Sequence, residues 1–202
     1  EIYTLSLHDA LPISLRSTLF QVWRKGVDTE VFHPRFRNQE MRKRLTDGHP
    51  EDPVIVYVGR LGTEKNLTFL KEILARLPNL RLAFVGDGPS REDLEQFFAG
   101  TKTTFVGMLH GEDLSAAYAS ADVFVMPSET ETLGFVVMEA MASKVPVVAV
   151  RAGGIPDIID SQGRNFVLSL YFLILRPCFR ERWISVRVWK RSRGDVLHQV
   201  SY

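Results

Sequence analysis

Apolar runs and helix-like spacings alternate along residues 53–159. Residues 54–58 form a continuous apolar run, as expected of a parallel strand that is buried on both faces. Within residues 67–77 the apolar side chains recur three and four positions apart, which predicts an amphipathic helix. The same alternation predicts further strands at 82–85, 104–106, 123–126 and 145–150, and further helices at 91–98, 114–119, 133–142 and from 156 onward.

Strands that alternate with helices predict an α/β fold, here a Rossmann-like parallel sheet with helices on both faces. In such sheets ligands bind outside the carboxyl ends of the strands. Functional side chains are therefore expected in the loops that follow the strands.

The two ends of the chain lack this pattern. Residues 1–14 resemble the translation of a widely used sequencing adapter, and we exclude them from the fold as an artefact. We expect residues 15–52 to be an interdomain linker and residues 53–163 to be the folded, incomplete domain. Residues 164–202 are rich in Arg, Trp, Leu and Phe without periodicity, and we interpret them as a foreign tail. The alternative is a basic amphipathic tail that contacts anionic lipid.

Composition narrows the classes of partner. The 202 residues carry a net charge of +1, so charge favours neither a nucleic acid nor a membrane. From residue 164 on, eight basic and two acidic residues give +6, which leaves −5 on the rest. Cys178 is the single cysteine, so no disulfide framework is expected. The longest apolar run has ten residues, at 166–175, whereas a bilayer span needs about 20.

Two carboxylates eight positions apart are the most informative candidates. Glu131 follows the predicted strand 123–126, and Glu139 is expected about two turns into the next helix. At a rise of ~1.5 Å per residue they would lie on the order of 10 Å apart, which is a reach from a sugar across a diphosphate to a ribose. Gly134, in the expected first turn, would leave N–H groups free for the diphosphate. Without further motifs, the same spacing more often marks a loop acid and a solvated helix acid.

A loop with one glycine and two cations follows the first predicted strand. Gly59 permits a tight turn. Arg60 and Lys65 would face the carboxyl end of the strand and stabilise the charge of a departing nucleoside diphosphate. The alternative is surface charge, but a helix start is an unfavourable place for the cation of Lys65.

Three further loops leave alternatives open. The turn at residues 86–89 is as consistent with a structural role as with proximity to a nucleotide. In residues 105–110, the main chain of Met108 and Leu109 would lie near the base of a bound nucleotide. His110 is expected to face solvent. The Gly153-Gly154 pair either approaches a sugar or phosphate or simply connects two elements.

No metal or cofactor is expected. The sequence has no Asp-x-Asp pair and no Cys/His cluster with metal-ligand spacing. It also lacks a P-loop lysine motif and a Gly-x-Ser-x-Gly elbow. Basic residues and helix amino termini would take the place of a metal beside a diphosphate.

Taken in chain order, these motifs resemble the carboxyl-terminal, donor-binding half of the retaining GT-B glycosyltransferases (glycosyl transferase group 1). The resemblance covers about residues 20–160. It implies retention of sugar configuration, no metal, and a UDP-sugar held mainly by this half. It implies that Glu139 binds the ribose, Glu131 the donor sugar, and Arg60 and Lys65 the diphosphate, with Glu131, Arg60 and Lys65 as the catalytic set. The implied binding set is Gly59, Arg60, Lys65, Met108, Leu109, Glu131, Leu133, Gly134 and Glu139.

Within that family, residues 22–34 and 118–142 are similar to the plant-type sulfolipid synthases. This implies that the chain is the donor-binding half of an enzyme that transfers sulfoquinovose from UDP to diacylglycerol in the chloroplast. The lipid acceptor would bind an amino-terminal domain that this chain lacks, with membrane-surface contact in the parent enzyme. We expect no transferase turnover from the isolated chain. The alternatives are a non-catalytic nucleotide-sugar-binding module and a GT-B UDP-sugar epimerase, which the Glu131/Glu139 pair disfavours.

Overall fold

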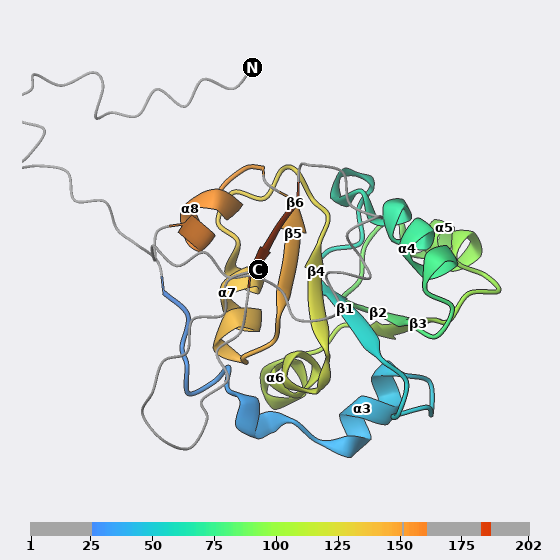
Figure 1. The fold of residues 1–202 in the computed structure, drawn as a ribbon, viewed down its shortest axis with the longest axis horizontal. Coiled ribbons are helices and arrows are strands. Elements are labelled where there is room, and N and C mark those ends of the chain that lie inside the picture. The colour runs from blue at the N-terminus through green and yellow to red at the C-terminus, as the bar shows by residue number, and fades with distance from the viewer. Residues whose placement is uncertain (1–25, 151, 161–182, 187–202) are drawn as a thin grey trace, which may run out of the picture.

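The computed structural model describes residues 26–150, 152–160 and 183–186 (Figure 1). The stretch interpreted as adapter, residues 1–14, lies outside the described residues. So does the expected tail, apart from residues 183–186.

One sheet of six strands, in the order β3-β2-β1-β4-β5-β6, forms the centre of the described part. The first five strands run parallel, as the alternation predicts, and the sixth pairs antiparallel with β5. All residues of β1, β2, β4 and β5 are buried, which accounts for their continuous apolar runs. The strands are β1 (Val54–Val58), β2 (Arg81–Val85), β3 (Thr103–Gly107), β4 (Val123–Met126), β5 (Val147–Val150) and β6 (Trp183–Val186).

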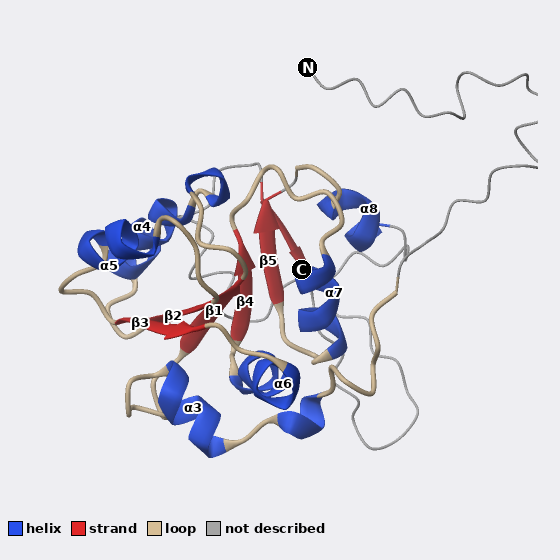
Figure 2. Ribbon diagram, turned by 180° about the vertical axis from the view of Figure 1, so that it is seen from behind, coloured by secondary structure: helices blue, strands red, loops and turns tan. Residues whose placement is uncertain are grey.

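Helices cover both faces of this sheet, as predicted (Figures 1 and 2). The chain moves outward from β1 to β3 and then crosses back to β4, beside β1. Because parallel crossovers are right-handed, this reversal puts the later helices on the opposite face from the earlier ones. One face carries α4 (Leu70–Arg76) and α5 (Arg91–Phe97), and the other carries α3 (Gln39–Leu45), α6 (Gly111–Ser120) and α7 (Phe135–Ala142), while α8 (Ile155–Asp160) follows β5. Among the described residues, no helix combines the length and apolarity that crossing a bilayer requires.

Several element boundaries differ from the prediction, for local reasons. Gly134 has φ 54°, so α7 begins at Phe135 rather than at residue 133. Asn66 also has a positive φ, 53°, and the chain after it forms a 3-10 turn, η3 (Leu67–Phe69), before α4. β5 begins after Pro146, which has no N–H for the ladder and accepts a hydrogen bond from the Phe124 amide at 2.8 Å. The apolar run of β6 is too short to stand out in a segment without periodicity.

Helix α3 lies within the stretch expected to be linker, yet it is anchored to the domain by a buried arginine. Arg42 donates to the carbonyl of Ser120 at 2.8 Å and to the carboxylate of Asp122 at 2.7 Å. It also donates to the carbonyls of Pro50 and Asp52 at 3.0 and 2.7 Å. These bonds join α3 to the end of α6 and to the entrance of β1. The burial of Arg42 is therefore matched by partners for its guanidinium.

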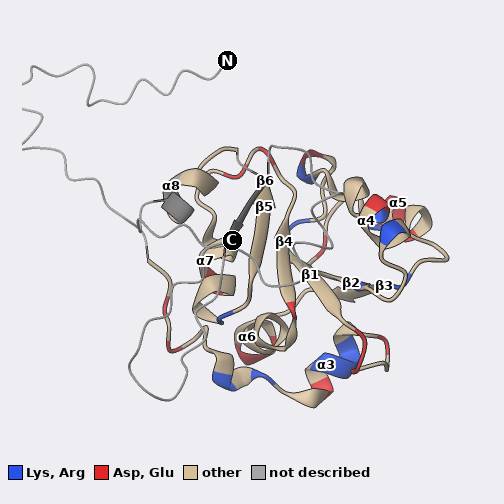
Figure 3. Cartoon of the chain, in the orientation of Figure 1, with Lys and Arg blue, Asp and Glu red and all other residues tan. Residues whose placement is uncertain are grey.

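The facing ends of two helices differ in charge: the last turn of α3 is basic and the first turn of α6 is acidic. The last turn of α3 contains Arg42, Lys43 and Arg44, and the first turn of α6 contains Glu112 and Asp113. Figure 3 marks the basic residues of α3 in blue and the acidic residues of α6 in red. Both distributions suit the helix dipoles, which favour cations at the carboxyl end and anions at the amino end.

Candidate functional site

The loops after β1 and β4 meet where the strand order reverses. β1 lies between β2 and β4, and the chain leaves β1 towards β2 but leaves β4 towards β5. A ligand crevice forms at such a switch point, outside the carboxyl ends of the strands. The fold therefore places the loop with Arg60 and Lys65 beside the loop with Glu131.

Lys65 and Glu131 form an ion pair across this switch point. The Lys65 Nζ lies 3.2 Å from Glu131 Oε2, and the two side chains are only 18% and 19% exposed. Lys65 ends the 3-10 turn η2 (Thr63–Lys65). The other carboxylate oxygen of Glu131 accepts from the Gly134 amide at 3.4 Å. The pair links the loop after β1 to the loop after β4. Because its side chains are shielded, salt screens it less than it would a surface pair.

Arg60 is exposed, and its guanidinium makes no hydrogen bond or ion pair to any of the described residues. Its main chain is held in place by a hydrogen bond, which the Tyr57 hydroxyl donates to the Arg60 carbonyl at 3.0 Å. Burial, and then the charges of Glu131 and Glu64, raise the pKa of Tyr57, so this hydroxyl stays protonated. The guanidinium at the strand ends is thus available to an anionic ligand.

The amino end of α7 faces the same edge of the sheet. Its N-cap residue is Gly134, no side chain caps the helix, and no acid lies in the first turn. A helix start of this kind favours an anion through its dipole and its amides. Since α7 begins at Phe135, Glu139 is its fifth residue and lies about one turn into the helix. The expectation of two turns was wrong because the left-handed Gly134 delays the helix.

Glycines hold the Glu131 loop in place through main-chain contacts. A Cβ on Gly153 would lie 2.2 Å from the Glu131 carbonyl oxygen, and one on Gly154 would lie 2.1 Å from that of Thr132. The Gly154 amide donates to the Glu131 carbonyl at 2.7 Å. The Cβ position of Gly134 lies 2.3 Å from Cδ1 of Ile158, which is the movable end of a side chain. The Gly153-Gly154 pair therefore packs one loop against another.

The turn at residues 86–89 supports the Arg60 loop in the same way. A Cβ on Gly86 would lie 2.0 Å from the Gly59 carbonyl oxygen, and one on Gly88 would lie 2.4 Å from that of Leu61. The Leu61 amide donates to the Asp87 carbonyl at 2.9 Å. Only residues without a Cβ allow this approach, so these glycines have a packing role.

Glu139 lies on the side of α7 that faces α6. The Tyr118 hydroxyl donates to Glu139 Oε2 at 2.7 Å. Burial raises the pKa of Glu139, while the hydrogen bond from Tyr118 acts to lower it. Tyr118 is itself fully buried, which raises its pKa well above the ordinary value, so it remains a donor.

Met108, Leu109 and Leu133, the remaining residues of the predicted binding set, differ in how far their side chains are exposed. Met108 is 57% and Leu133 is 49% exposed, whereas Leu109 is 6% exposed with its side chain in the core. Only the main chain of Leu109 can therefore face a ligand. His110 is exposed at the N-cap of α6, as expected, and its side chain caps nothing.

Sequence reasoning gave no role to Tyr57 and Tyr118, the two buried tyrosines that support the site. A signal was available, because each interrupts a run of small or aliphatic residues in a buried element. A buried phenol normally has a hydrogen-bond partner. The partner itself could not be read from the sequence, since Tyr118 and Glu139 lie on different helices 21 positions apart.

Metal ligands do not cluster in the part of the chain that the structure describes. No group of three or more His, Cys, Asp and Glu side chains there could hold a metal ion. The charged groups at the switch point include the Arg60 and Lys65 cations and the Glu131 carboxylate.

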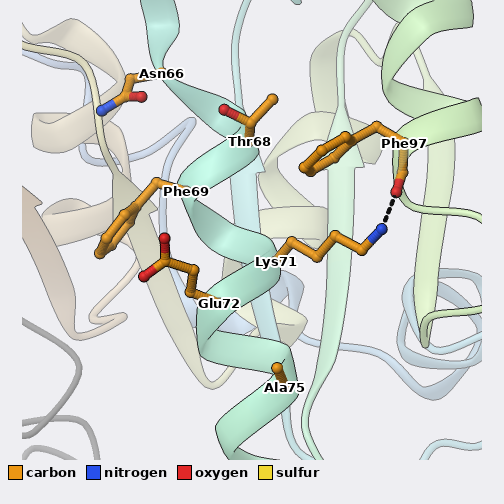
Figure 4. A pocket seen from close by; sticks show the side chains of 7 residues that line it. All are labelled: Asn66, Thr68, Phe69, Lys71, Glu72, Ala75 and Phe97. Carbon is orange, nitrogen blue, oxygen red and sulfur yellow. Dashed lines mark hydrogen bonds between the residues drawn. The ribbon is translucent and has the colours of Figure 1, made fainter.

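A shallow groove lies away from the switch point, between α4 and α5 (Figure 4). It has a volume of about 440 Å³. Lys71 crosses it, with its ammonium 4.5 Å from the Phe97 ring centroid and hydrogen-bonded to the Phe97 carbonyl. Because the switch-point residues do not line it, we assign this groove no part in the site.

The doubly wound sheet, with its switch point between β1 and β4, is the architecture expected of one half of a GT-B fold. Residues 52–170 match the family described as glycosyl transferases group 1. This chain belongs to that family.

Relatives differ in the donor that their names state. The sulfoquinovosyl transferase SQD2 of Arabidopsis thaliana is 60% identical over 72% of this chain and 29% of its own length. A GDP-mannose-dependent alpha-mannosyltransferase of Mycobacterium tuberculosis is 44% identical over 73% of this chain and 38% of its own length. The chain thus spans well under half the length of these curated relatives.

A solved structure supports the fold assignment. The Anabaena protein Alr3699/HepE in complex with UDP-glucose superposes with a TM-score of 0.59 at 25% identity. The match covers 71% of this chain and 42% of that one. The prediction of a Rossmann-like parallel sheet belonging to one half of a GT-B fold is therefore confirmed.

Proposed function

We propose that this chain is the donor-binding part of a retaining glycosyltransferase that uses a UDP-sugar. The observation that carries the proposal is the Lys65–Glu131 pair, bonded in turn to the amide before α7, at the switch point between β1 and β4. It brings a cation, an acid and a helix amino end to one edge of the sheet. Those are the groups that a sugar joined to a diphosphate requires.

Each predicted residue has a role in this proposal. Arg60, Lys65 and the start of α7 hold the diphosphate, and Gly59 shapes the loop that carries Arg60. Glu131, with Leu133 and Gly134 beside it, lies against the donor sugar. Glu139 accepts hydrogen bonds from the ribose, and the main chain at Met108 and Leu109 meets the base.

The chemistry follows from charge and position. The bond between the sugar C1 and the UDP oxygen breaks while a bond from C1 to the acceptor oxygen forms on the same face. The acceptor proton passes to the departing diphosphate oxygen, so no protein nucleophile takes part. Arg60 and Lys65 stabilise the charge that develops on UDP. We propose that this chemistry is independent of metal, since the two cations and α7 supply the positive charge.

The donor and acceptor are proposed from similarity. The 60% identity to SQD2 over residues of this domain supports sulfoquinovose as the sugar. Diacylglycerol as the lipid acceptor, membrane-surface contact in the whole enzyme and a chloroplast location belong to the same proposal. The 44% identity to a GDP-mannose-dependent enzyme makes the nucleotide the first point to test.

Titration calorimetry of the chain with UDP and with GDP tests the proposal. We expect UDP to bind more tightly than GDP. Arg60→Ala should weaken UDP binding roughly tenfold, as the loss of a charge-assisted contact implies. Lys102→Ala is the matched control, because Lys102 is an exposed cation directly before β3, at the opposite edge of the sheet. Tighter binding of GDP would refute the UDP assignment, and equal losses in both variants would refute the site.

A further inference from the structure

The contact between Tyr118 and Glu139 joins α6 to α7. The phenol oxygen of Tyr118 lies 2.7 Å from Glu139 Oε2. The other carboxylate oxygen, Oε1, has no hydrogen-bond partner among the residues that the structure describes. One oxygen is thus fixed by the protein, and the other can accept a bond from a ligand.

Tyr118 has little freedom to move away from this contact. Its side chain is fully buried. The ring of Phe32 packs edge-on against it at 5.8 Å between centroids, and the ring of Phe124 lies at 5.7 Å. These neighbours come from the segment before α3 and from β4, so two separate elements hold the phenol in one orientation.

We propose that Tyr118 is a positioning residue, which holds the Glu139 carboxylate so that its free oxygen meets the ribose hydroxyls of the bound nucleotide. This inference rests on the proposed function, in which Glu139 binds the ribose. Tyr118 itself does not touch the nucleotide. It acts by restricting the carboxylate to one geometry before the ligand arrives, which reduces the entropy lost on binding.

The charged residues on the elements around Glu139 do not replace the effect of this hydrogen bond on its pKa. β4 and β5 carry no charged side chain, and the acids of α6, Glu112 and Asp113, lie in its first turn, far from Tyr118. In the segment before α3, Glu30 is paired with Arg35. No cation among these groups faces Glu139, so the Tyr118 donor is what favours its charged form.

Binding of UDP and of 2′-deoxy-UDP to the chain, measured by calorimetry, tests the inference. Wild type should prefer UDP because the deoxy analogue lacks a hydroxyl for Glu139. Tyr118→Phe keeps both ring contacts and should weaken UDP binding about fivefold, as loss of one hydrogen bond to a charged group implies, with a smaller effect on the deoxy analogue. The preference for UDP should therefore shrink.

Two variants separate a positioning role from a merely structural one. Tyr57→Phe also removes a buried hydroxyl, the one that donates to the Arg60 carbonyl, but it should leave the preference for the ribose hydroxyl unchanged. Glu139→Ala should abolish that preference. An unchanged preference in Tyr118→Phe together with its loss in Glu139→Ala would overturn the inference and leave the proposed function standing. An unchanged preference in Glu139→Ala would overturn both.

The pH profile of UDP binding supplies a second readout. Affinity should fall as pH falls through the pKa of Glu139, because the acid form is a poorer acceptor. Removing the Tyr118 donor removes the interaction that lowers this pKa, so the fall should begin at a higher pH in Tyr118→Phe. Superimposable profiles for wild type and Tyr118→Phe would count against the positioning role.

Discussion

Lys65 and Glu131 lie 66 positions apart in the chain and 3.2 Å apart in the structure, between the ammonium nitrogen and a carboxylate oxygen. Neither is at the surface like an ordinary ion pair, and each lies on a loop that leaves a different strand at the switch point. A diphosphate that enters this edge would share the cation with the carboxylate. Under the proposed function, the pair therefore contributes to the charge balance that a donor would meet.

Lys65→Met should weaken binding of UDP about tenfold and of UMP much less, since a single phosphate reaches fewer of the loop cations. Calorimetry with the two nucleotides measures the difference. Glu131→Gln is the matched variant, because it breaks the same ion pair but keeps the cation. We expect its UDP affinity to stay within about twofold of wild type. Equal losses in both variants would show that Lys65 acts only by holding Glu131.

Gly154→Ala should destabilise the domain by roughly 2–3 kcal/mol, because the new Cβ would collide with main chain rather than with a movable side chain. The Cβ position is 2.1 Å from the Thr132 carbonyl oxygen. Urea unfolding monitors the loss, and UDP binding should weaken with it because the loop of Glu131 shifts. Gly100→Ala is the control: its φ is +77° but nothing lies within 4 Å of the Cβ. It should lose about 1 kcal/mol from backbone strain and bind UDP normally. Unchanged stability in Gly154→Ala would refute the packing role, and normal UDP affinity would show that the Glu131 loop does not depend on it.

Arg42→Met should destabilise the domain by roughly 2–4 kcal/mol, because it leaves buried carbonyls and the Asp122 carboxylate without their donor. Thermal or urea unfolding measures this change. Arg44→Met provides the comparison on the same helix, since Arg44 is 48% exposed and 4.0 Å from Asp113. It should change stability by less than about 0.5 kcal/mol. Similar values for the two variants would mean that α3 is not anchored through Arg42.

Glu139→Gln should stabilise the folded chain at neutral pH. Burial raises the folded pKa of Glu139 above its ordinary value of 4.5, so the folded state binds a proton more readily than the unfolded state. The stability of wild type should therefore fall as pH rises from below 4.5 through the folded pKa, and the variant should escape that loss. Melting temperatures measured across this range should converge at low pH and separate at neutral pH. A constant difference at every pH would contradict the assignment to Glu139.

The strand-and-helix order was predictable because the buried strands are largely continuous apolar runs, as in Val54–Val58. The switch-point loops were predictable too, since parallel topology puts Lys65 and Glu131 at one edge. What could not be predicted depends on contacts between distant segments. The role of Gly154 needs the position of the Thr132 carbonyl, and the role of Tyr118 needs the angle between α6 and α7. Neither quantity is encoded by local spacing.

The glycine contacts beneath the two site loops have a consequence for the diversification of this fold. Gly86 against Gly59, and Gly153 against Glu131, are meetings of main chain with main chain. A scaffold of that kind does not change when the residues projecting from it are exchanged. Under the proposed function, the groups that meet base and sugar could therefore be replaced without rebuilding their support. On this view, relatives named for sulfoquinovose and for GDP-mannose can share one main-chain scaffold and differ in the side chains that it carries.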